Sequence, residues 1–489
     1  MCFHRTSLIL FYCLIASTLY SQLNVNPDSV LIVRHRDTLS TIPKNMVNAS
    51  GLILACNMGV WGFDRYITES PFAYIDFNTI HSNLKTGFEW DNDNFFTNLM
   101  THPVNGGIYF NALRSNGLNF WESIPLTTAG SLMWELCMEN QLPSINDFIT
   151  TSIGGTCLGE TTFRITDRFI DDRTTGLERI KREAMIFIIS PTRGLNRLLN
   201  GETWKHGHTR GNTISISPLT FYTSFGYRGM TNNTLNEKFA ITMPSFDLGL
   251  YYGTPFDPGN EKPYDFFWFR VGGNISSQQP VIHSVNALGM LYARNIHLKR
   301  PTHQLTLGIF QHYNYYQSQG ENNNPSLLTY QVSETASVGT GLIYKSSRIK
   351  NITFSCSLHL STMLMGGSQT GHYFIYERNY NMGSGYSSKG SLDLQFGSKA
   401  RLLLNAENYR LYSWTGNSPK NAGKFNTNVM GDKGNHSNSL LRVNLSYIIN
   451  KHFLLDAETV YYFFKSVYDY YPTVNQSAAE NKVSVGYVF

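Results

Sequence analysis

Polar residues that could perform acid–base chemistry are concentrated in the first half of the chain. His102 is followed by Glu135 and Asp147, and each lies in text with helical spacing. Glu135 and Glu139 are four residues apart, so both carboxylates share one helix face. A histidine with two carboxylates could bind a metal, or act as base and orienter for a serine hydroxyl such as that of Ser152. His102, Glu135 and Asp147 are therefore the candidate catalytic residues.

The spacing of these residues matches no known catalytic or metal motif. The sequence contains no HExxH, no GxSxG and no pair of close histidines with a metal-binding context. The favoured interpretation is a buried hydrogen-bonded network that holds tightly packed helices together. Glycines stand inside the same helical text, where each costs about 1 kcal/mol against alanine, so we expect them to let helices approach closely. They are Gly106, Gly107, Gly154, Gly155 and Gly159.

The helices that would position these residues form a predicted domain over residues 46–202, after an extended linker at 22–45. We expect a short buried or re-entrant helix at Asn48–Phe63, and helices at Asn94–Ser115 and Ser131–Gln141. Ser144–Asn146 can cap a helix that starts at Asp147, and Ser190–Pro191 can start another. His206 and His208 are predicted to lie in a turn, since they resemble a metal pair only superficially.

A chain of motifs runs through this region. The motifs are Glu89-Trp90-Asp91-x-Asp93-x-Phe95, His102-Pro103-x-x-Gly106-x-x-Tyr109 with Arg114, Ser131-x-x-Trp134-Glu135, Pro143-Ser144-x-x-Asp147, Gly154-Gly155-x-x-x-Gly159-Glu160 and Ser190-Pro191-x-Arg193-Gly194-x-Asn196-Arg197-Leu198. Together they resemble a bacterial domain family of unknown function found in outer-membrane proteins. The likeness covers roughly residues 75–202 and implies an outer-membrane setting and a helical domain fused to strands, without an activity.

From about residue 212 onward, short segments with alternating polarity replace the helical text. Val483, Val485, Tyr487 and Phe489 alternate with Ser484, Gly486 and Val488 at the end of the chain. A period of two over 9–11 residues is typical of membrane strands, which must close on one another because lipid offers no hydrogen bonds. The terminal aromatics also resemble the assembly signal of outer-membrane proteins.

The connections between these segments favour a membrane barrel over a soluble sandwich. Short polar turns alternate along the chain with long loops. The turns are at 345–348, 397–398 and 450–451, and the long loops are at 317–328, 366–387, 415–437 and 466–477. Outer-membrane barrels have this asymmetry between periplasmic turns and external loops. The predicted fold is a transmembrane antiparallel barrel of about twelve strands over residues 203–489, preceded by the α-helical domain.

The composition and the first residues agree with an exported membrane protein. Charged residues make up 15% of the 489 and aromatic residues 14%, and the mean hydropathy is −0.23. Soluble proteins carry about a quarter charged residues. Residues 1–21 are predicted to be a cleaved signal peptide, with a membrane anchor as the alternative. The later cysteines are expected to be small buried hydrophobes, although a Cys137–Cys157 disulfide is permitted.

Two classes of function follow. In the first, the barrel is a channel, binding module or structural module of the outer membrane, gated or plugged by helices on the periplasmic side. Arg401, Asp456 and Glu458 would then line a path for a small polar solute. In the second, a lipid-directed hydrolase or acyltransferase uses His102 with Glu135 or Asp147. Expected partners are outer-membrane lipid and, through Phe489, the barrel-assembly machinery. No cofactor, metal or nucleic acid is expected.

Overall fold

The computed structural model describes residues 42–91, 93–207, 218–234, 237–298, 302–318, 330–349, 351–375, 377–421 and 429–489. The chain divides into two compact units. The helical unit contains the described residues up to Phe88 and from Pro103 to 207, and the barrel unit contains residues 89–102 and 218–488. The predicted signal peptide, most of the predicted linker and His208 lie outside the described residues.

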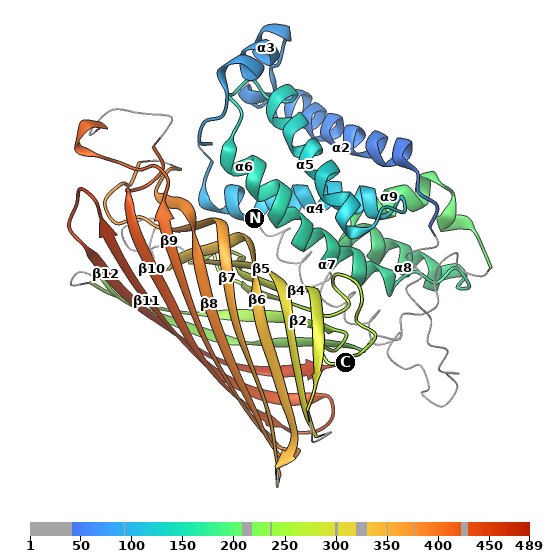
Figure 1. The fold of residues 1–489 in the computed structure, drawn as a ribbon, viewed down its shortest axis with the longest axis vertical. Helices are drawn as coiled ribbons and strands as arrows, with labels where there is room; N and C mark the ends of the chain where they lie inside the picture. The colour runs from blue at the N-terminus through green and yellow to red at the C-terminus, as the bar shows by residue number, and fades with distance from the viewer. Residues whose placement is uncertain are drawn as a thin grey trace. The chain divides into compact units, whose positions relative to one another are not determined.

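The helical part of the chain contains helices of very different length (Figure 1). They are α2 (Met46–Tyr66), η3 (Pro71–Ala73), α3 (Phe77–Thr86), η4 (Thr97–Thr101), α4 (His102–Arg114), α5 (Phe120–Cys137), α6 (Ile145–Ile149), η5 (Thr150–Gly154), α7 (Gly155–Asp167), α8 (Gly176–Ile189), α9 (Pro191–Leu199) and η6 (Glu202–Trp204). η4 and η5 are single π-helical turns, and each leads directly into an α-helix.

Helix α5 corrects the sequence prediction, because it starts eleven residues before Ser131. Its first turn is held by a capping box, in which Asn119 accepts from the backbone N–H of Glu122 and Glu122 accepts from that of Asn119. Such reciprocal bonds satisfy two donors that the first turn leaves open. The Asn-x-x-Glu spacing was visible in the sequence, so this start could have been predicted.

The glycines of α4 and α7 bring these two helices into backbone contact, as the sequence predicted. A Cβ atom on Gly106 would collide with the carbonyl of Thr151, and one on Gly155 would lie 2.9 Å from the backbone nitrogen of Gly107. A Cβ on Gly159 would lie 2.8 Å from the Cβ of Phe110. The close approach therefore requires the absence of side chains on both helices.

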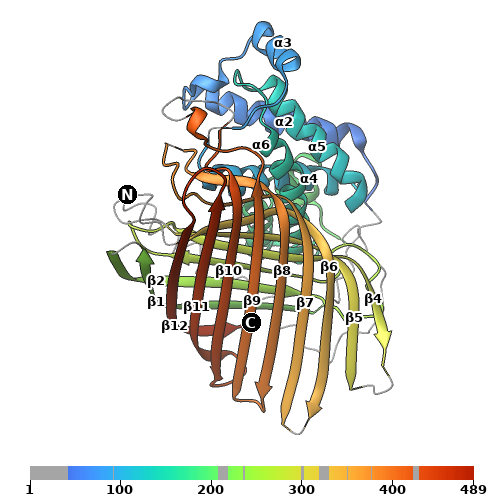
Figure 2. The same ribbon diagram turned by 60° about the vertical axis from the view of Figure 1, so that its left-hand side comes forward.

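The strands form a closed antiparallel barrel, which confirms the predicted fold class and the number of strands (Figures 1 and 2). Neighbours in sequence are neighbours in the sheet, and β1 pairs with β12 from Tyr222↔Val488 to Asn232↔Ala478. The strands are β1 (Leu219–Thr234), β2 (Glu237–Tyr252), β3 (Phe267–Asn274), β4 (Ile282–His297), β5 (His303–Gln317), β6 (Gln331–Ile349), β7 (Ile352–Gln369), β8 (Tyr380–Phe396), β9 (Ala400–Ser413), β10 (Gly434–Ile448), β11 (Phe453–Tyr468) and β12 (Val474–Val488).

The predicted alternation of short and long connections holds from β5 to β11. It fails before β5, and the long loop predicted at 466–477 is a five-residue connection, 469–473. The 14-residue connection at 253–266 lies at the end of the barrel that carries the tight turns, whereas β1 and β2 are joined by two residues at the long-loop end. The 253–266 connection folds against the wall, where buried Tyr264 donates to Gln311 at 2.9 Å. This longer connection is thus held in place by side-chain contacts with the barrel wall.

Replacing Gly155 by alanine is expected to destabilise the helical unit, because the added methyl group meets the backbone of α4. Overpacking of this kind costs about 1–3 kcal/mol. The measurement is protease resistance of the helical unit in the full-length chain. Gly51→Ala is the matched control, since nothing lies within 4 Å of its Cβ position. Equal resistance of the two variants would contradict the close packing.

Candidate functional site

Two of the predicted catalytic residues lie in one buried hydrogen-bonded cluster between α5 and α6. The carboxylate of Glu135 accepts from the backbone N–H of Ser144 at 2.7 Å. The hydroxyl of Ser144 donates to Asn146 at 3.0 Å, and the amide of Asn146 donates to Asp147 at 2.8 Å. All four side chains are almost fully buried. These contacts hold the turn between the two helices. They agree with the interpretation that both carboxylates belong to a buried hydrogen-bonded network that holds packed helices together.

The third predicted residue, His102, ends the segment that belongs to the barrel unit. Its Nε2 lies 4.0 Å from a carboxylate oxygen of Asp93. Burial lowers the pKa of His102, and the negative charge of Asp91 opposes that shift. The candidate nucleophile Ser152 is buried in η5, within the helical unit. The catalytic role of His102, Glu135 and Asp147 stays a prediction.

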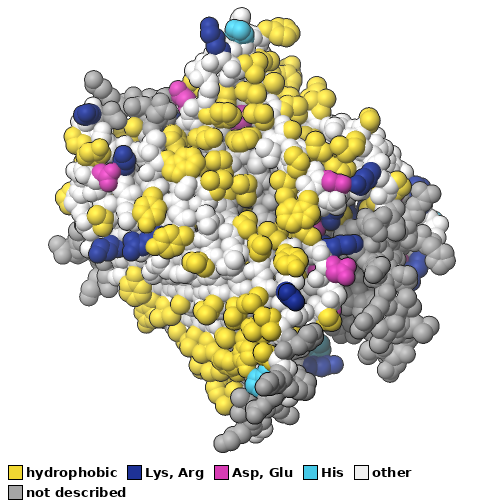
Figure 3. Space-filling model, in the orientation of Figure 1, with side chains coloured by type: hydrophobic (Ala, Val, Ile, Leu, Met, Phe, Trp, Pro, Cys, Tyr) yellow, Lys and Arg dark blue, Asp and Glu magenta, His cyan; other side chains and the backbone are white. Residues whose placement is uncertain are grey.

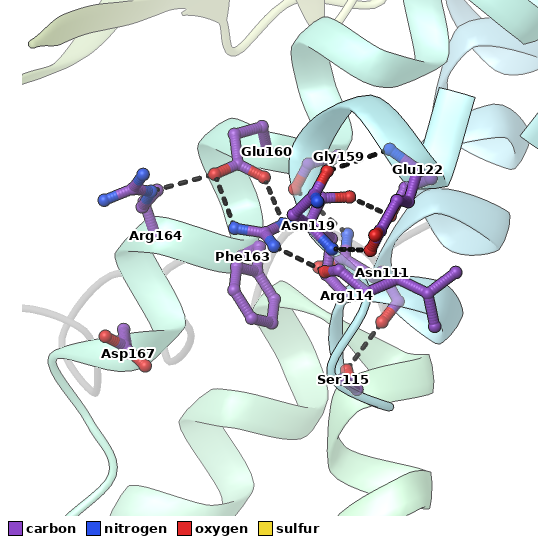
Figure 4. A network of polar contacts seen from close by, with 12 residues as sticks. Asn111, Arg114, Ser115, Asn119, Glu122, Gly159, Glu160, Phe163, Arg164 and Asp167 are labelled. Atoms are coloured by element: carbon purple, nitrogen blue, oxygen red, sulfur yellow. Dashed lines mark hydrogen bonds and ion pairs between the residues drawn. The ribbon is translucent and has the colours of Figure 1, made fainter. Parts of the chain in front are cut away.

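A buried charged centre in the helical unit joins side chains of α4 and α7. The guanidinium of Arg114 on α4 donates to both oxygens of Glu160 on α7, at 2.7 and 3.1 Å (Figure 4). Arg164, one turn further along α7, donates to the same carboxylate at 2.8 Å. Glu160 is 0% exposed. The sequence showed the Glu160–Arg164 spacing, but the partner from α4 follows only from the helix crossing.

This centre is a structural clamp. Burial would raise the pKa of Glu160, but Arg114 and Arg164 outweigh it and lower the pKa below its usual value. Arg114 also donates to the carbonyl of Leu118 at 2.6 Å, which fixes the turn after α4. Its guanidinium lies 4.7 Å from the ring centre of Phe163. Because two guanidinium groups compensate its charge and both of its oxygens accept hydrogen bonds, the carboxylate is held in its ionised form.

Residues 89–102 form a segment that packs on the barrel wall. The ring of Phe95 lies 5.4 Å from that of Tyr315 and 5.3 Å from that of Tyr380. The amide of Asn98 donates to the hydroxyl of Tyr380 at 2.5 Å, and the hydroxyl of Tyr380 donates to the carbonyl of Asp93 at 2.9 Å. These residues thus group with the barrel unit, and the domain division predicted at residue 202 stays a prediction.

The segment lies on the outer face of the wall, at the long-loop end. Side chains of successive strand residues point to opposite faces. Tyr316 bonds Glu407 of β9 across the lumen, so Tyr315 points outward. Likewise Asn381 pairs with inward-facing Ser368, which leaves Tyr380 outward. Residues 89–102 therefore do not occupy the lumen.

Inside the barrel, Arg228 contacts residues of the adjacent strand and residues of strands that are not its neighbours. Arg228 of β1 donates to Glu480 of β12 at 3.0 Å, to Asn274 of β3 at 3.0 Å, and to the hydroxyl of Tyr330, the residue before β6. Arg228 is 1% exposed and Tyr330 is 0% exposed. In a water-filled channel these lining groups would be accessible to solvent. At this level the lumen is closed.

Further contacts fill the lumen around this bridge. The ring of Tyr330 stacks on that of Tyr462 of β11, with ring centres 4.1 Å apart. Arg270 of β3 donates to Glu458 of β11 at 3.1 Å. Of the predicted lumen residues, Glu458 takes part in this network, Asp456 accepts from Tyr222 of β1 at 2.5 Å, and Arg401 pairs with Asp393 of the adjacent strand at 2.8 Å.

A groove of about 930 Å³ lies along β5 to β11. Most of its lining residues point away from the lumen, by the same alternation. Its floor is formed by small side chains of β8 and β9, including Ser388, Gly390 and Ala406, and apolar Leu360 and Leu441 stand beside it. The groove suits an apolar occupant on the outside of the wall and is not a solute path.

Residues 87–192 match the model of a family described as Domain of unknown function (DUF3943). The predicted resemblance is confirmed. The match assigns a domain and no activity. It contains both the wall-bound segment 89–102 and the Arg114–Glu160 clamp. No curated protein matches the chain.

Solved structures that are similar to this chain are membrane barrels. The NanC porin is 9% identical with a TM-score of 0.27, and the alignment covers 54% of this chain and 98% of the porin. The KdgM porin is 12% identical with a TM-score of 0.23, covering 55% and 99%. The translocator domain of the autotransporter NalP from Neisseria meningitidis is 11% identical with a TM-score of 0.23, covering 61% and 95%. The barrel assignment rests on the strand pairing of the chain itself.

Glu160→Gln is expected to destabilise the helical unit by roughly 3–5 kcal/mol, because it leaves two buried guanidinium groups uncompensated. The lowered pKa sets the pH dependence: the stabilisation is fully present above the ordinary value of 4.5 and is lost as the pH falls through the lower folded value. Chemical denaturation followed by proteolysis measures both effects. Glu178→Gln, which breaks a surface pair with Arg182, is the control and should cost at most about 1 kcal/mol. Equal losses would contradict the clamp.

Docking of residues 89–102 is expected to be firmer at pH 5.5 than at pH 8. Burial, Asp91 and Glu377 raise the pKa of Asp93 to about 7, so the docked state favours the protonated carboxyl and loses this advantage as the pH rises. Asp93→Asn should retain the firm docking at pH 8. Hydrogen exchange of the backbone amides of residues 93–102 measures the effect, with the exposed Asp257→Asn as control. Identical exchange at both pH values in the unaltered chain would rule it out.

Proposed function

We propose that the chain is an outer-membrane protein whose barrel is a closed scaffold for a helical domain, in place of a permanently open pore. The observation that carries this proposal is the bridge from Arg228 to Tyr330, which joins opposite sides of the lumen. The outer surface supports the membrane setting. Exposed apolar residues such as Leu445, Leu455 and Val485 face away from the lumen, and Figure 3 shows hydrophobic side chains covering the lower wall.

The docking of residues 89–102 supports a scaffold role. Outward-facing tyrosines that would otherwise contact lipid or water are buried beneath helical residues of the matched domain. A solute channel needs an accessible lumen, whereas a scaffold needs a rigid wall with a specific attachment site. The described barrel has the second set of features. The attachment site lies at the long-loop end of the barrel, and long loops are external in outer-membrane barrels, which supports an external location in place of the predicted periplasmic one.

A gated channel for a small polar solute is the second candidate. It is favoured by the charged lumen, where a conformational change could exchange the partners of three bonds. These bonds join Arg270 to Glu458, Tyr222 to Asp456 and Arg228 to Glu480. Outer-membrane lipid and, through Phe489, the assembly machinery are the proposed partners. A lipid-directed hydrolase acting through His102 is the remaining alternative, and it predicts that His102→Ala changes the envelope lipids.

Conductance in planar bilayers tests the scaffold proposal. The unaltered chain is expected to leave the current at baseline. The double variant Arg228→Ala, Glu480→Ala should give stepwise openings, because it removes the bridge without leaving an unpaired charge. Arg401→Ala, which breaks a pair between adjacent strands, is the control and should leave the current unchanged. Steady ionic current through the unaltered chain would overturn the proposal and favour the channel.

A further inference from the structure

Helix α2 has the length and composition of a membrane-crossing segment. Its 21 residues span about 31 Å at 1.5 Å per residue, close to the roughly 30 Å of a bilayer's hydrocarbon core. Residues 45–63 contain no charged side chain. Among the described residues, it is the one helix long and apolar enough to cross a membrane. The expectation of a short buried or re-entrant helix is thus corrected in length.

The polar groups of α2 are used on its inner face. The amide of Asn57 donates to the carbonyl of Gly130 on α5 at 3.1 Å and accepts from the hydroxyl of Tyr109 on α4. Leu52 and Ile53 are buried beside it. On the inner face, Asn57 therefore has hydrogen-bond partners on α4 and α5, and this face is a helix–helix interface. The outer face is formed by other residues.

Most of the exposed side chains of α2 are apolar, apart from Asn48 and Ser50 near its start. Val47 is 81% exposed, Met58 52% and Phe63 54%, with Leu54 and Val60 between them. Figure 3 shows hydrophobic side chains gathered over α2 and α5, with charged side chains set toward the edges. A contiguous surface of this kind marks a contact with lipid or protein, since soluble surfaces rarely expose large side chains in series.

Helix α5 runs parallel to α2, and polar contacts join the two helices at their starts and at their ends. We call these two positions the polar levels. Lys44 before α2 pairs with Glu122 in the first turn of α5 at 2.5 Å, and the side chain of Asn140 after α5 donates to the carbonyl of Pro71 after α2 at 2.9 Å. Between Glu122 and Glu135, α5 carries no charge. Two parallel helices thus have charged and polar groups at the same two levels and an uncharged stretch between them.

Each polar level has the amphipathic residues that membrane interfaces favour. At the end of α2, the guanidinium of Arg65 lies 3.3 Å from the ring centre of Tyr74. The indole of Trp61 donates to the carbonyl of Ala73 at 3.0 Å. At the opposite level, Trp121 at the start of α5 is 56% exposed. Tryptophan at both levels, with arginine and tyrosine at one and lysine at the other, is typical of a helix fixed in a bilayer.

We propose that the outer face of the α2–α5 pair contacts the hydrocarbon of a lipid bilayer, with Lys44 and Arg65 at its two polar boundaries. Lipid fits this face better than a protein partner does, because the apolar length equals the bilayer thickness and the interfacial residues mark both ends. The proposal rests on the proposed membrane setting of the chain, and it is independent of whether the barrel conducts.

Photo-crosslinking to lipid tests the proposal. The photoreactive amino acid p-benzoylphenylalanine replaces Met58 in the full-length chain, which is reconstituted into vesicles of phosphatidylethanolamine and phosphatidylglycerol and then irradiated. Mass spectrometry should find phospholipid adducts at least tenfold above those with the same residue at Lys181, which is exposed on α8. A second position, Phe63, is the most conservative replacement and guards against misfolding at Met58.

Each outcome decides the matter. Phospholipid adducts at Met58 and Phe63, and not at Lys181, support the proposal. Equal yields at all three positions, or adducts to a second copy or to the chain itself, overturn it. Retained heat-modifiable migration of each variant on gels shows that the barrel is intact, so failure here is distinguishable from failure of the scaffold proposal.

Discussion

Pairing of β1 with β12 is the interaction on which the rest of the barrel depends. Eleven residues of β1 face partners on β12, and this seam joins the two ends of the barrel sequence. Without the seam, two strand edges would face lipid with unpaired amides and carbonyls, which costs several kcal/mol per group. The lumen network relies on the same seam, because Arg228 and Glu480 lie on opposite sides of it. Closure therefore fixes both the backbone and the charged interior.

Each unit contains a buried ion pair between arginine and glutamate, and in each unit the pair restricts the arrangement of the surrounding elements. Glu160 receives bonds from two helices, and Arg228 receives partners from the strand beside it and from residues far across the barrel. A buried ion pair contributes little net stability against an apolar core of the same volume. It does penalise any arrangement that separates its members. These pairs therefore select one helix crossing and one barrel interior among alternatives of similar packing.

The sequence predicted the barrel well because period-two alternation is a local property. All the strands lie within the region predicted as the barrel, although β6 continues to Ile349, through the tight turn predicted at 345–348. Helix α5 was predicted too short, although its Asn119 capping box was readable. The buried ion pair of the helical unit could not be predicted in the same way. Arg114 and Glu160 are 46 residues apart, and only the glycine-dependent crossing of α4 and α7 brings them together.

The attachment of residues 89–102 to the barrel wall has a consequence for biogenesis. Asn98 bonds Tyr380, which lies 282 positions later in the chain. The segment is synthesised and exported first, yet its binding surface exists only after β5 to β8 have assembled. Until then Phe95 and Leu99, both buried in the finished structure, have no partner. The segment must remain undocked while these strands insert, and its docking is a late step that reports the assembly of β5 to β8.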